Sequence, residues 1–212
     1  MEFERFLQYV PKITKLPLPG EEAHFKMAPP ERKEKMRNVD FSKINPRKAA
    51  VMMLVFPLQN VAHLALIQRN SYKGVHSSQV AFPGGKVEPF DTTDLNAALR
   101  ETSEEIGVIQ SEINIISPFS EVYIPPSNFF VAPFLGYCIT TPLFVPDPRE
   151  VAGMVFMSLA DLIDDNNLLI KNMATSYSAA VDVPAFIAGE HVIWGATAMM
   201  LSELKDVIKA VI

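Results

Sequence analysis

The stretch FPGGKVEPFDTTDLNAALRETSEEIGV, residues 82–108, decides the fold of this chain. It opens near a pair of glycines and ends in a run that holds three glutamates. On a helix Glu101, Glu104 and Glu105 lie at positions i, i+3 and i+4, so all three project from one side. Like charges at these spacings repel each other, which predicts that a cation lies among them.

The same segment has the pattern of a single amphipathic helix. Gly107 is expected to end this helix, and Asp91, Thr92 or Thr93 to cap its beginning. A role of Asp91 in the site is compatible with capping. Opposite the acidic face, apolar residues recur at helical spacing and predict a buried face: Leu95, Ala98, Leu99, Thr102 and Ile106.

An acidic helix face most often simply faces water. Here it is combined with an upstream glycine turn, a neighbouring arginine and a terminal glycine, and this combination resembles the Nudix box. The matching residues are Gly85, Arg100, Glu101, Glu104, Glu105, Gly107 and Val108. The resemblance is strong over roughly residues 49–133 and weaker towards the C-terminus.

Three positions depart from the generic box. The interval from Gly85 to Arg100 is one residue longer, the spaced acid is Asp91 instead of Glu, and Thr102 replaces an aliphatic residue. The apolar spacing of the helix is unbroken, so we expect the loop before Thr93 to absorb the extra residue.

The longer interval is similar to that of one Nudix subgroup, the coenzyme A pyrophosphatases, which has acids at the positions of both Glu88 and Asp91. The preceding stretch LIQRNSYKGVHSSQVAFPGG, residues 66–85, resembles the second signature of this subgroup. Its matching side chains, which the resemblance implies bind substrate, are Arg69, His76 and Gln79.

Two residues of this second stretch differ from the subgroup. Gly74 stands where an arginine is usual, and Ser78 where a glycine is usual. Lys73 is the nearest residue that can supply the missing charge, and we expect it to meet the 3′-phosphate of coenzyme A. A second segment similar to the subgroup, YIPPSN at 123–128, either shapes the substrate pocket or forms a rigid crossover.

Elementary chemistry supports a metal site at the acidic face. A diphosphate repels an incoming hydroxide, and a divalent cation neutralises charge and lowers the pKa of bound water. Mg²⁺ or Mn²⁺ suits oxygen ligands, which predicts Glu101, Glu104, Glu105 and the carbonyl of Gly85 as metal ligands.

The general base and the role of the box arginine are less closely determined by the sequence. Glu101 or the distant loop acid Glu150 is expected to act as general base, and the sequence does not choose between them. The resemblance implies that Arg100 orients a glutamate instead of touching the substrate.

The leading hypothesis is a metal-dependent pyrophosphohydrolase that cleaves coenzyme A or its thioesters into 3′,5′-ADP and 4′-phosphopantetheine. The alternatives are a Nudix hydrolase of ADP-ribose, NADH, a dinucleotide polyphosphate or a similar compound, and a ligand-sensing domain without catalysis. The last is disfavoured because such domains commonly lose box carboxylates, which this chain keeps.

Composition narrows the class of protein. The chain has 212 residues, 49% hydrophobic and 20% charged, with a net charge of −5, which is typical of a globular protein and argues against nucleic-acid binding. Cys138 is the only cysteine and is expected to be a buried thiol. A single cysteine cannot form a disulfide within the chain, and this, together with the lack of a secretory signal, predicts a cytoplasmic location. No apolar run suits a membrane span. The expected partner is a small nucleotide, and a homodimer is left open.

The pattern of elements predicts an α/β fold, and the resemblance implies a Nudix-type α/β/α sandwich with a mixed sheet. We expect an N-terminal extension over 1–48 that packs on a Nudix domain over 49–212. In the N-terminal half we expect a helix at 2–10 ended by Pro11 and a hairpin of strands at 49–57 and 62–68. Strands at 113–118 and 130–137 follow, joined irregularly through a double proline. The remaining elements are a strand at 155–159, two short strands within 182–193, and a helix from 196.

Overall fold

The central strand β1, Arg47–Leu58, is buried on both faces in the computed structural model, which describes all residues except 30–31, 35–38, 41–42, 71–78 and 174–179. Successive side chains of a strand point to opposite faces, so the continuous apolar run at the middle of β1 supplies two cores. One core receives Ala50, Met52, Leu54 and Phe56, and the other receives Met53 and Val55.

The neighbours of β1 make the sheet mixed, as expected from the sequence. β1 pairs antiparallel with β2, Val61–Arg69, through a two-residue turn. Both turn residues, Gln59 and Asn60, have positive φ angles of 49° and 66°, which is the geometry of a type I′ hairpin. On its other side β1 runs parallel to β7, Phe129–Tyr137.

Among the described residues, five further strands complete the first sheet and three form a second one. β3 (Val80–Ala81) and β8 (Val151–Ser158) pair with β2, β4 (Gly84–Lys86) pairs with β1, and β5 (Asn114–Pro118) and β6 (Val122–Ile124) pair with β7. A separate sheet joins β9 (Leu168–Met173), β10 (Val181–Ala188) and β11 (His191–Ile193). The sequence prediction missed the short strands β3, β4 and β6 and also β9. The double proline begins directly after β6, where the ladder ends.

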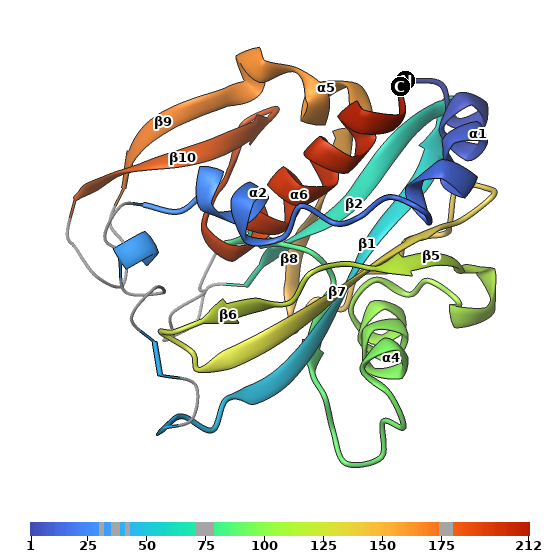
Figure 1. Cartoon of the computed structure of the whole chain (residues 1–212). Helices are drawn as coiled ribbons and strands as arrows, with labels where there is room; N and C mark the ends of the chain where they lie inside the picture. The colour runs from blue at the N-terminus through green and yellow to red at the C-terminus, as the bar shows by residue number, and fades with distance from the viewer. Residues whose placement is uncertain (30–31, 35–38, 41–42, 71–78, 174–179) are drawn as a thin grey trace.

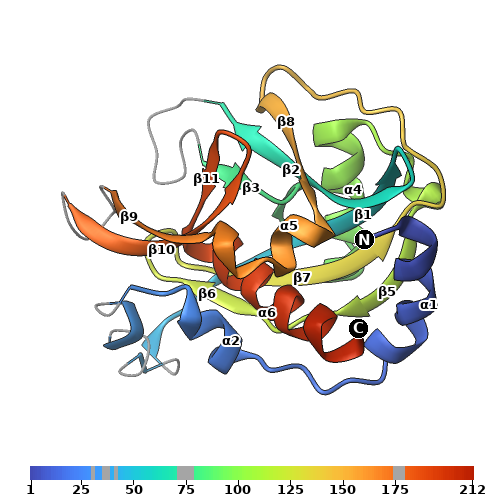
Figure 2. The same cartoon turned by 90° about the horizontal axis from the view of Figure 1, so that it is seen from above.

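Helices cover both faces of the first sheet (Figures 1 and 2). α4, Asp94–Ile106, packs on one face, while α6, Gly195–Val211, and α1, Phe3–Ile13, pack on the other. The predicted α/β/α sandwich is therefore confirmed. The short elements are α2 (Glu21–Lys26), α5 (Leu159–Ile163), η2 (Gln110–Glu112) and η3 (Asp165–Asn167).

The first helix is longer than predicted. Pro11 lies inside α1 instead of ending it, and the helix continues to Ile13, which is 2% exposed in the core. Proline removes one helical hydrogen bond, but the amide of Thr14 still reaches the carbonyl of Val10 at 3.2 Å. Burial of Ile13 offsets the lost bond. The division of the chain at residue 48 stays a prediction.

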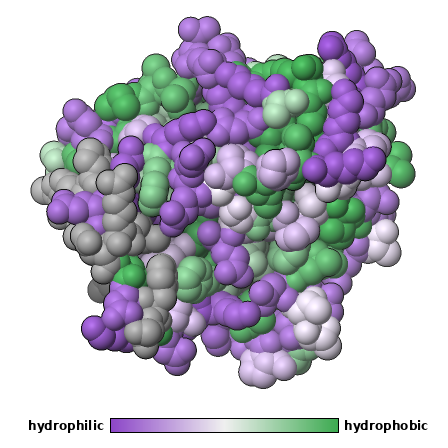
Figure 3. All heavy atoms as spheres, viewed as in Figure 1, coloured by the Kyte–Doolittle hydropathy of each residue, from purple (hydrophilic) through white to green (hydrophobic). Residues whose placement is uncertain are grey.

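On the face shown in Figure 3, polar and apolar side chains are interspersed. No helix among the described residues has the length and apolar character needed to cross a membrane. Cys138 directly follows β7 and is buried as expected, and this burial raises the pKa of its thiol to about 11.

Candidate active site

The acidic helix α4 begins and ends on residues that its sequence predicts. The hydroxyl of Thr93 accepts a hydrogen bond from the amide of Asn96, so Thr93 is the N-cap. Gly107 ends the helix in the left-handed region with φ 74°. The helix is regular from 94 to 106, and the extra residue of the box lies in the preceding loop, as predicted.

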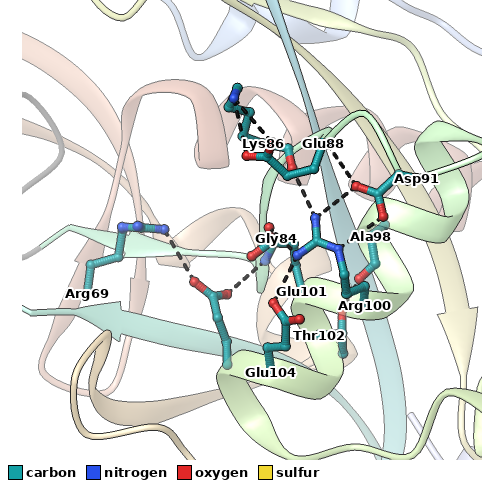
Figure 4. Close-up of polar contacts among 11 residues, drawn as sticks. Arg69, Gly84, Lys86, Glu88, Asp91, Ala98, Arg100, Glu101, Thr102 and Glu104 are labelled. Carbon is teal, nitrogen blue, oxygen red and sulfur yellow. Dashed lines mark hydrogen bonds and ion pairs between the residues drawn. The ribbon is translucent and has the colours of Figure 1, made fainter.

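Arg100 lies at the centre of the site and binds three carboxylates (Figure 4). Its Nε and Nη2 donate to the two oxygens of Asp91 at 3.0 and 2.9 Å. Its Nη1 donates to Oε1 of Glu101 at 2.8 Å and to Oε2 of Glu104 at 2.9 Å. Asp91 is therefore a partner of Arg100 and not the helix cap, and the hydrogen bond from Arg100 lowers the pKa of the Asp91 carboxyl. The cation expected among the glutamates is, in part, this guanidinium.

Glu101 lies against the glycine turn. A Cβ atom on Gly85 would lie 2.5 Å from the carboxyl carbon of Glu101, so only glycine lets the backbone of β4 approach this carboxylate so closely. The Glu101 side chain is 15% exposed. Burial raises the pKa of its carboxyl, although the hydrogen bond from Arg100 opposes the rise.

Glu105 is the exception on the acidic face, because it is buried. The residue is only 2% exposed, whereas the Glu104 side chain is 59% exposed. Oε2 of Glu105 accepts from the amide of Gly84 at 2.8 Å, and Oε1 lies 3.6 Å from Nη1 of Arg69. Burial raises the pKa of the Glu105 carboxyl to about 7, and the charges of Glu101 and Glu150 add to the rise. The sequence pattern does not predict that one of the three glutamates turns inward.

The remaining predicted site residues are only partly described. Arg69 ends β2 beside Glu105, and Glu150 is exposed just before β8. The charge of Glu150 contributes to the raised pKa of both Glu101 and Glu105, so the structure brings it to the same site. Lys73 and His76 lie outside the described residues.

A cavity of about 280 Å³ adjoins the glycine turn. Arg69 and Gln79, two of the residues predicted to bind substrate, both line it, and Arg69 lies next to Glu105. The lining also includes residues of β6, β7, α6 and the 125–128 connection: Ile124, Ser127, Phe129, Ala196, Thr197 and Met200. The prediction that 123–128 shapes a pocket therefore agrees with the geometry, and α6 adds Met200, to which the sequence assigned no role in a site.

The donors at the acidic face suit a hard divalent cation. Oε1 of Glu101 and Oε2 of Glu104 bind Arg100, and among the described residues the other oxygen of each accepts no hydrogen bond. In that part of the chain, however, no three acidic, histidine or cysteine side chains converge as a ready-made metal site. The oxygen chemistry thus fits Mg²⁺ or Mn²⁺, with Arg100 holding two of the candidate ligands.

This fold and this carboxylate cluster next to a glycine turn define a class of protein. The NUDIX domain family model matches residues 46–177, which is more than half of the chain. The chain therefore belongs to the Nudix family.

Curated relatives narrow the comparison. The chain is 31% identical over 157 residues to the human protein "Mitochondrial coenzyme A diphosphatase NUDT8", a match that covers 73% of this chain and 66% of the relative. It is 30% identical to the mouse protein of the same name, over 73% of this chain and 75% of that one. It is also 29% identical to "Probable nudix hydrolase C6G9.05" of Schizosaccharomyces pombe, over 74% and 54%. The matches thus leave a quarter to nearly half of each relative uncovered.

Solved structures confirm the fold alone. A MutT/nudix family protein from Enterococcus faecalis aligns with a TM-score of 0.54 at 16% identity, covering 92% of this chain and 76% of that one. The Nudix hydrolase RenU from M. smegmatis aligns with a TM-score of 0.53 at 17% identity, over 79% and 88%.

Proposed function

We propose that the chain is a Mg²⁺- or Mn²⁺-dependent pyrophosphohydrolase that cleaves the diphosphate of coenzyme A or acyl-coenzyme A to 3′,5′-ADP and 4′-phosphopantetheine. The observation that carries the chemistry is the cluster of Glu101, Glu104 and Glu105, packed against a glycine turn that borders a cavity. The substrate is supported by the names of the human and mouse relatives and by the sequence from 66 to 85.

In this proposal Glu101, Glu104, Glu105 and the carbonyl of Gly85 hold the cation. When bound, the cation supplies charge neutralisation for the diphosphate and lowers the pKa of an attacking water. Arg100 keeps Glu101 and Glu104 turned to one side of α4, because a single nitrogen binds one oxygen of each. This leaves the second oxygen of each carboxylate available as a ligand for the cation.

The attacking water needs a base within hydrogen-bond reach. Two acids qualify by position: Glu101, which is mostly buried and bound to Arg100, and Glu150, which is exposed beside the cluster. We favour Glu150, because Arg100 and the glycine turn already engage Glu101. An exposed acid on a loop is free to accept a proton and pass it to solvent.

The substrate is proposed to lie across the cavity. Arg69, whose side chain is 28% exposed and lines the cavity, is placed to meet a phosphate, and Gln79 lines the same end. The apolar side chains that line the cavity suit the uncharged part of the molecule. Lys73 and His76 complete the proposed substrate-binding set, with Lys73 reading the 3′-phosphate that distinguishes coenzyme A from its dephospho form.

A small nucleotide is the proposed partner, with no role for nucleic acid or a membrane. The homodimer and the cytoplasmic location stay predictions, and the word mitochondrial in the names of two relatives makes the compartment a separate question.

The test is a substrate panel with purified protein and Mg²⁺ or Mn²⁺: coenzyme A, dephospho-coenzyme A, ADP-ribose, NADH and diadenosine tetraphosphate. We expect coenzyme A to have the highest kcat/KM, about tenfold above dephospho-coenzyme A, because Lys73 offers a point charge without bidentate geometry. Faster turnover of another compound would replace coenzyme A as the substrate, and no turnover of any would remove the hydrolase proposal.

The variant Lys73→Ala separates phosphate recognition from general support. It should abolish the preference for coenzyme A and leave turnover of the dephospho form nearly intact. Equal losses on both substrates would mean that Lys73 supports its loop instead of contacting the 3′-phosphate.

A further inference from the structure

The end of the acidic helix is covered by a distant part of the chain, residues 145–151. The last carbonyls of an α-helix have no partner within the helix. In α4 the amide of Asp147 donates to the carbonyl of Glu105, and the amide of Val145 to that of Ile106, both at 2.9 Å. A Cβ atom on Gly107 would lie 2.8 Å from the Cβ of Val145, so the 145–151 segment lies directly against the helix end.

The 145–151 segment is folded into a compact turn around Asp147. The carbonyl of Asp147 accepts from the amides of Glu150 at 3.1 Å and Val151 at 2.9 Å. Its carboxylate accepts from the amide and the guanidinium of Arg149. The turn therefore ends at Glu150, the acid favoured above as general base.

Asn70, the residue after β2, forms two hydrogen bonds to this turn. Its amide donates to the carbonyl of Glu150 at 3.0 Å, and its side-chain Nδ2 donates to the carbonyl of Pro148 at 2.8 Å. The second bond depends on the asparagine side chain, so a substitution removes it while the backbone bond remains available.

The strand that follows also departs from regular pairing at this point. β8 pairs Gly153 with Gln68, but its next pair along β2 joins Val151 with Arg69, so Ala152 is an extra residue. Such a β-bulge redirects the chain and is frequent next to active sites. Here it separates the regular part of β8 from the turn that carries Glu150.

Both ends of the turn, Asp147 and Val151, contact residues at the Glu105 carboxylate. Asp147 bonds the backbone of Glu105, and Val151 pairs with Arg69, whose guanidinium lies 3.6 Å from the Glu105 side chain. Glu150 lies between these two ends. In the described part of the chain, its position beside the carboxylate cluster is thus set by backbone contacts, by the Asp147–Arg149 side-chain contacts within the turn, and by the Asn70 side chain.

We propose that Asn70 is a positioning residue: it holds the 145–151 segment so that Glu150 stays beside the carboxylates of α4. The role of Glu150 in this statement rests on the proposed function. Within the described residues, the side chain and the amide of Asn70 donate to backbone carbonyls and not to a reacting group. The competing explanation is that Asn70 only stabilises the end of β2, in which case its loss lowers stability without selectively affecting turnover.

The kinetic test compares Asn70→Ala, Asn70→Gln, Glu150→Gln and the double variant Asn70→Ala/Glu150→Gln. Each is assayed with whichever compound of the panel the parent protein turns over fastest, so the choice of coenzyme A does not affect the result. Asn70→Ala should lower kcat about tenfold with KM within about twofold, because a shifted base mainly affects the chemical step. Asn70→Gln keeps an amide donor and should recover most of the loss.

The double variant decides whether Asn70 acts through Glu150. Once Glu150 has been replaced, Asn70→Ala should cause no further fall in kcat, because the two changes remove one function. An additional tenfold fall in the double variant, a change in KM alone, or full activity of Glu150→Gln would each overturn the proposal. Asn114→Ala is the control, since Asn114 also donates to backbone carbonyls but lies on β5.

A second measurement does not require turnover. Hydrogen exchange at the amides of Glu150 and Val151 should be faster in Asn70→Ala than in the parent, while exchange in α4 before its last turn stays unchanged. Unaltered exchange at these two amides would overturn the proposal even if no compound of the panel is hydrolysed.

Discussion

Two helices of this protein each bury a glutamate, and the two carboxylates have opposite surroundings. Glu203 on α6 is 0% exposed and accepts four hydrogen bonds: from Gly20 N and Ser120 Oγ at Oε1, and from Ser120 N and His24 Nε2 at Oε2. Glu105 on α4 is 2% exposed, and among the described residues it accepts one hydrogen bond, from Gly84 N, with Arg69 Nη1 at 3.6 Å.

The pKa values of the two carboxyls differ accordingly. Burial alone would raise both. For Glu203 the bonds from His24 and Ser120 outweigh burial and lower the pKa, whereas for Glu105 burial prevails and raises the pKa to about 7. A buried carboxylate that is fully supplied with donors holds structure together. A buried carboxylate with fewer hydrogen-bond donors is suited to bind a cation or another ligand from outside the chain.

The largest effect should come from the fully bonded carboxylate. Glu203→Ala leaves three residues with buried donors that lack an acceptor, so we expect the free energy of unfolding to fall by about 3–5 kcal/mol. Urea denaturation measures it. The folded variant should keep the parental kcat.

Asp206→Ala is the matched control for Glu203→Ala. It removes the ion pair between Asp206 on α6 and Lys26 on α2, at 2.6 Å. Glu203 joins the same two helices, but the Asp206–Lys26 pair is exposed to solvent. The control should cost at most about 1 kcal/mol. Equal losses in both variants would contradict the structural role of the buried cluster.

The two glutamates should also give stability opposite dependences on pH in the metal-free protein. The folded pKa of Glu105, about 7, lies above its ordinary value of 4.5, so its contribution is complete below pH 4.5 and is lost as pH rises through 7. The loss amounts to up to about 3 kcal/mol. Glu203 has a lowered pKa, so its contribution is present above its ordinary value of 4.5 and is lost as pH falls through the folded pKa.

Urea denaturation of chelator-treated protein between pH 4.5 and 8 checks this dependence. Glu105→Gln should flatten the decline that the parent shows towards pH 8. If the decline persists unchanged in Glu105→Gln, another group titrates and the assignment is wrong.

Catalysis should show the reverse ranking of the two residues. Glu105→Gln removes the charge proposed to hold the cation, so turnover should fall by about 10² while the free energy of unfolding does not fall. Glu104→Gln should act in the same direction. The exposed Glu112→Gln is the control and should leave kcat unchanged. Near-parental rates in both box variants at saturating metal would mean that the carboxylates form only a charged helix face.

The smallest effect tests the helix that carries the site. Thr93→Ala removes the N-cap bond to Asn96 and should lower the free energy of unfolding by about 1 kcal/mol without changing kcat. Thr92→Ala, which loses only a contact to the Asn96 side chain, should cost less. A larger loss of unfolding free energy for Thr92→Ala than for Thr93→Ala would mean that Thr92 is the N-cap.

The sequence predicts what is decided within a few residues. A helix start at one of three capping residues, its end at Gly107 and a strand over the apolar run at 49–57 follow from local patterns, and the structure confirms them. The inward turn of Glu105 is different, because it depends on Gly84 of a neighbouring strand. The family resemblance identifies the three glutamates but does not predict which of them is buried or which groups it contacts.

Failures of the sequence prediction also have physical causes. β9 has no flanking glycine or proline to delimit it, and its pairing with β10 is tertiary. Pro11 was taken to end a helix that the packing of Ile13 extends. The bonds of Glu203 join residues up to 183 positions apart, and no local pattern predicts them.

That long separation affects how the protein is made. His24 and Ser120 leave the ribosome well before Glu203, and at roughly 5–20 residues per second the interval from His24 amounts to roughly 10–35 s. Throughout this time α2 and the loop at Ser120 lack the carboxylate that joins them. We therefore expect the N-terminal residues of a nascent chain to remain accessible to chaperones and proteases until α6 has emerged.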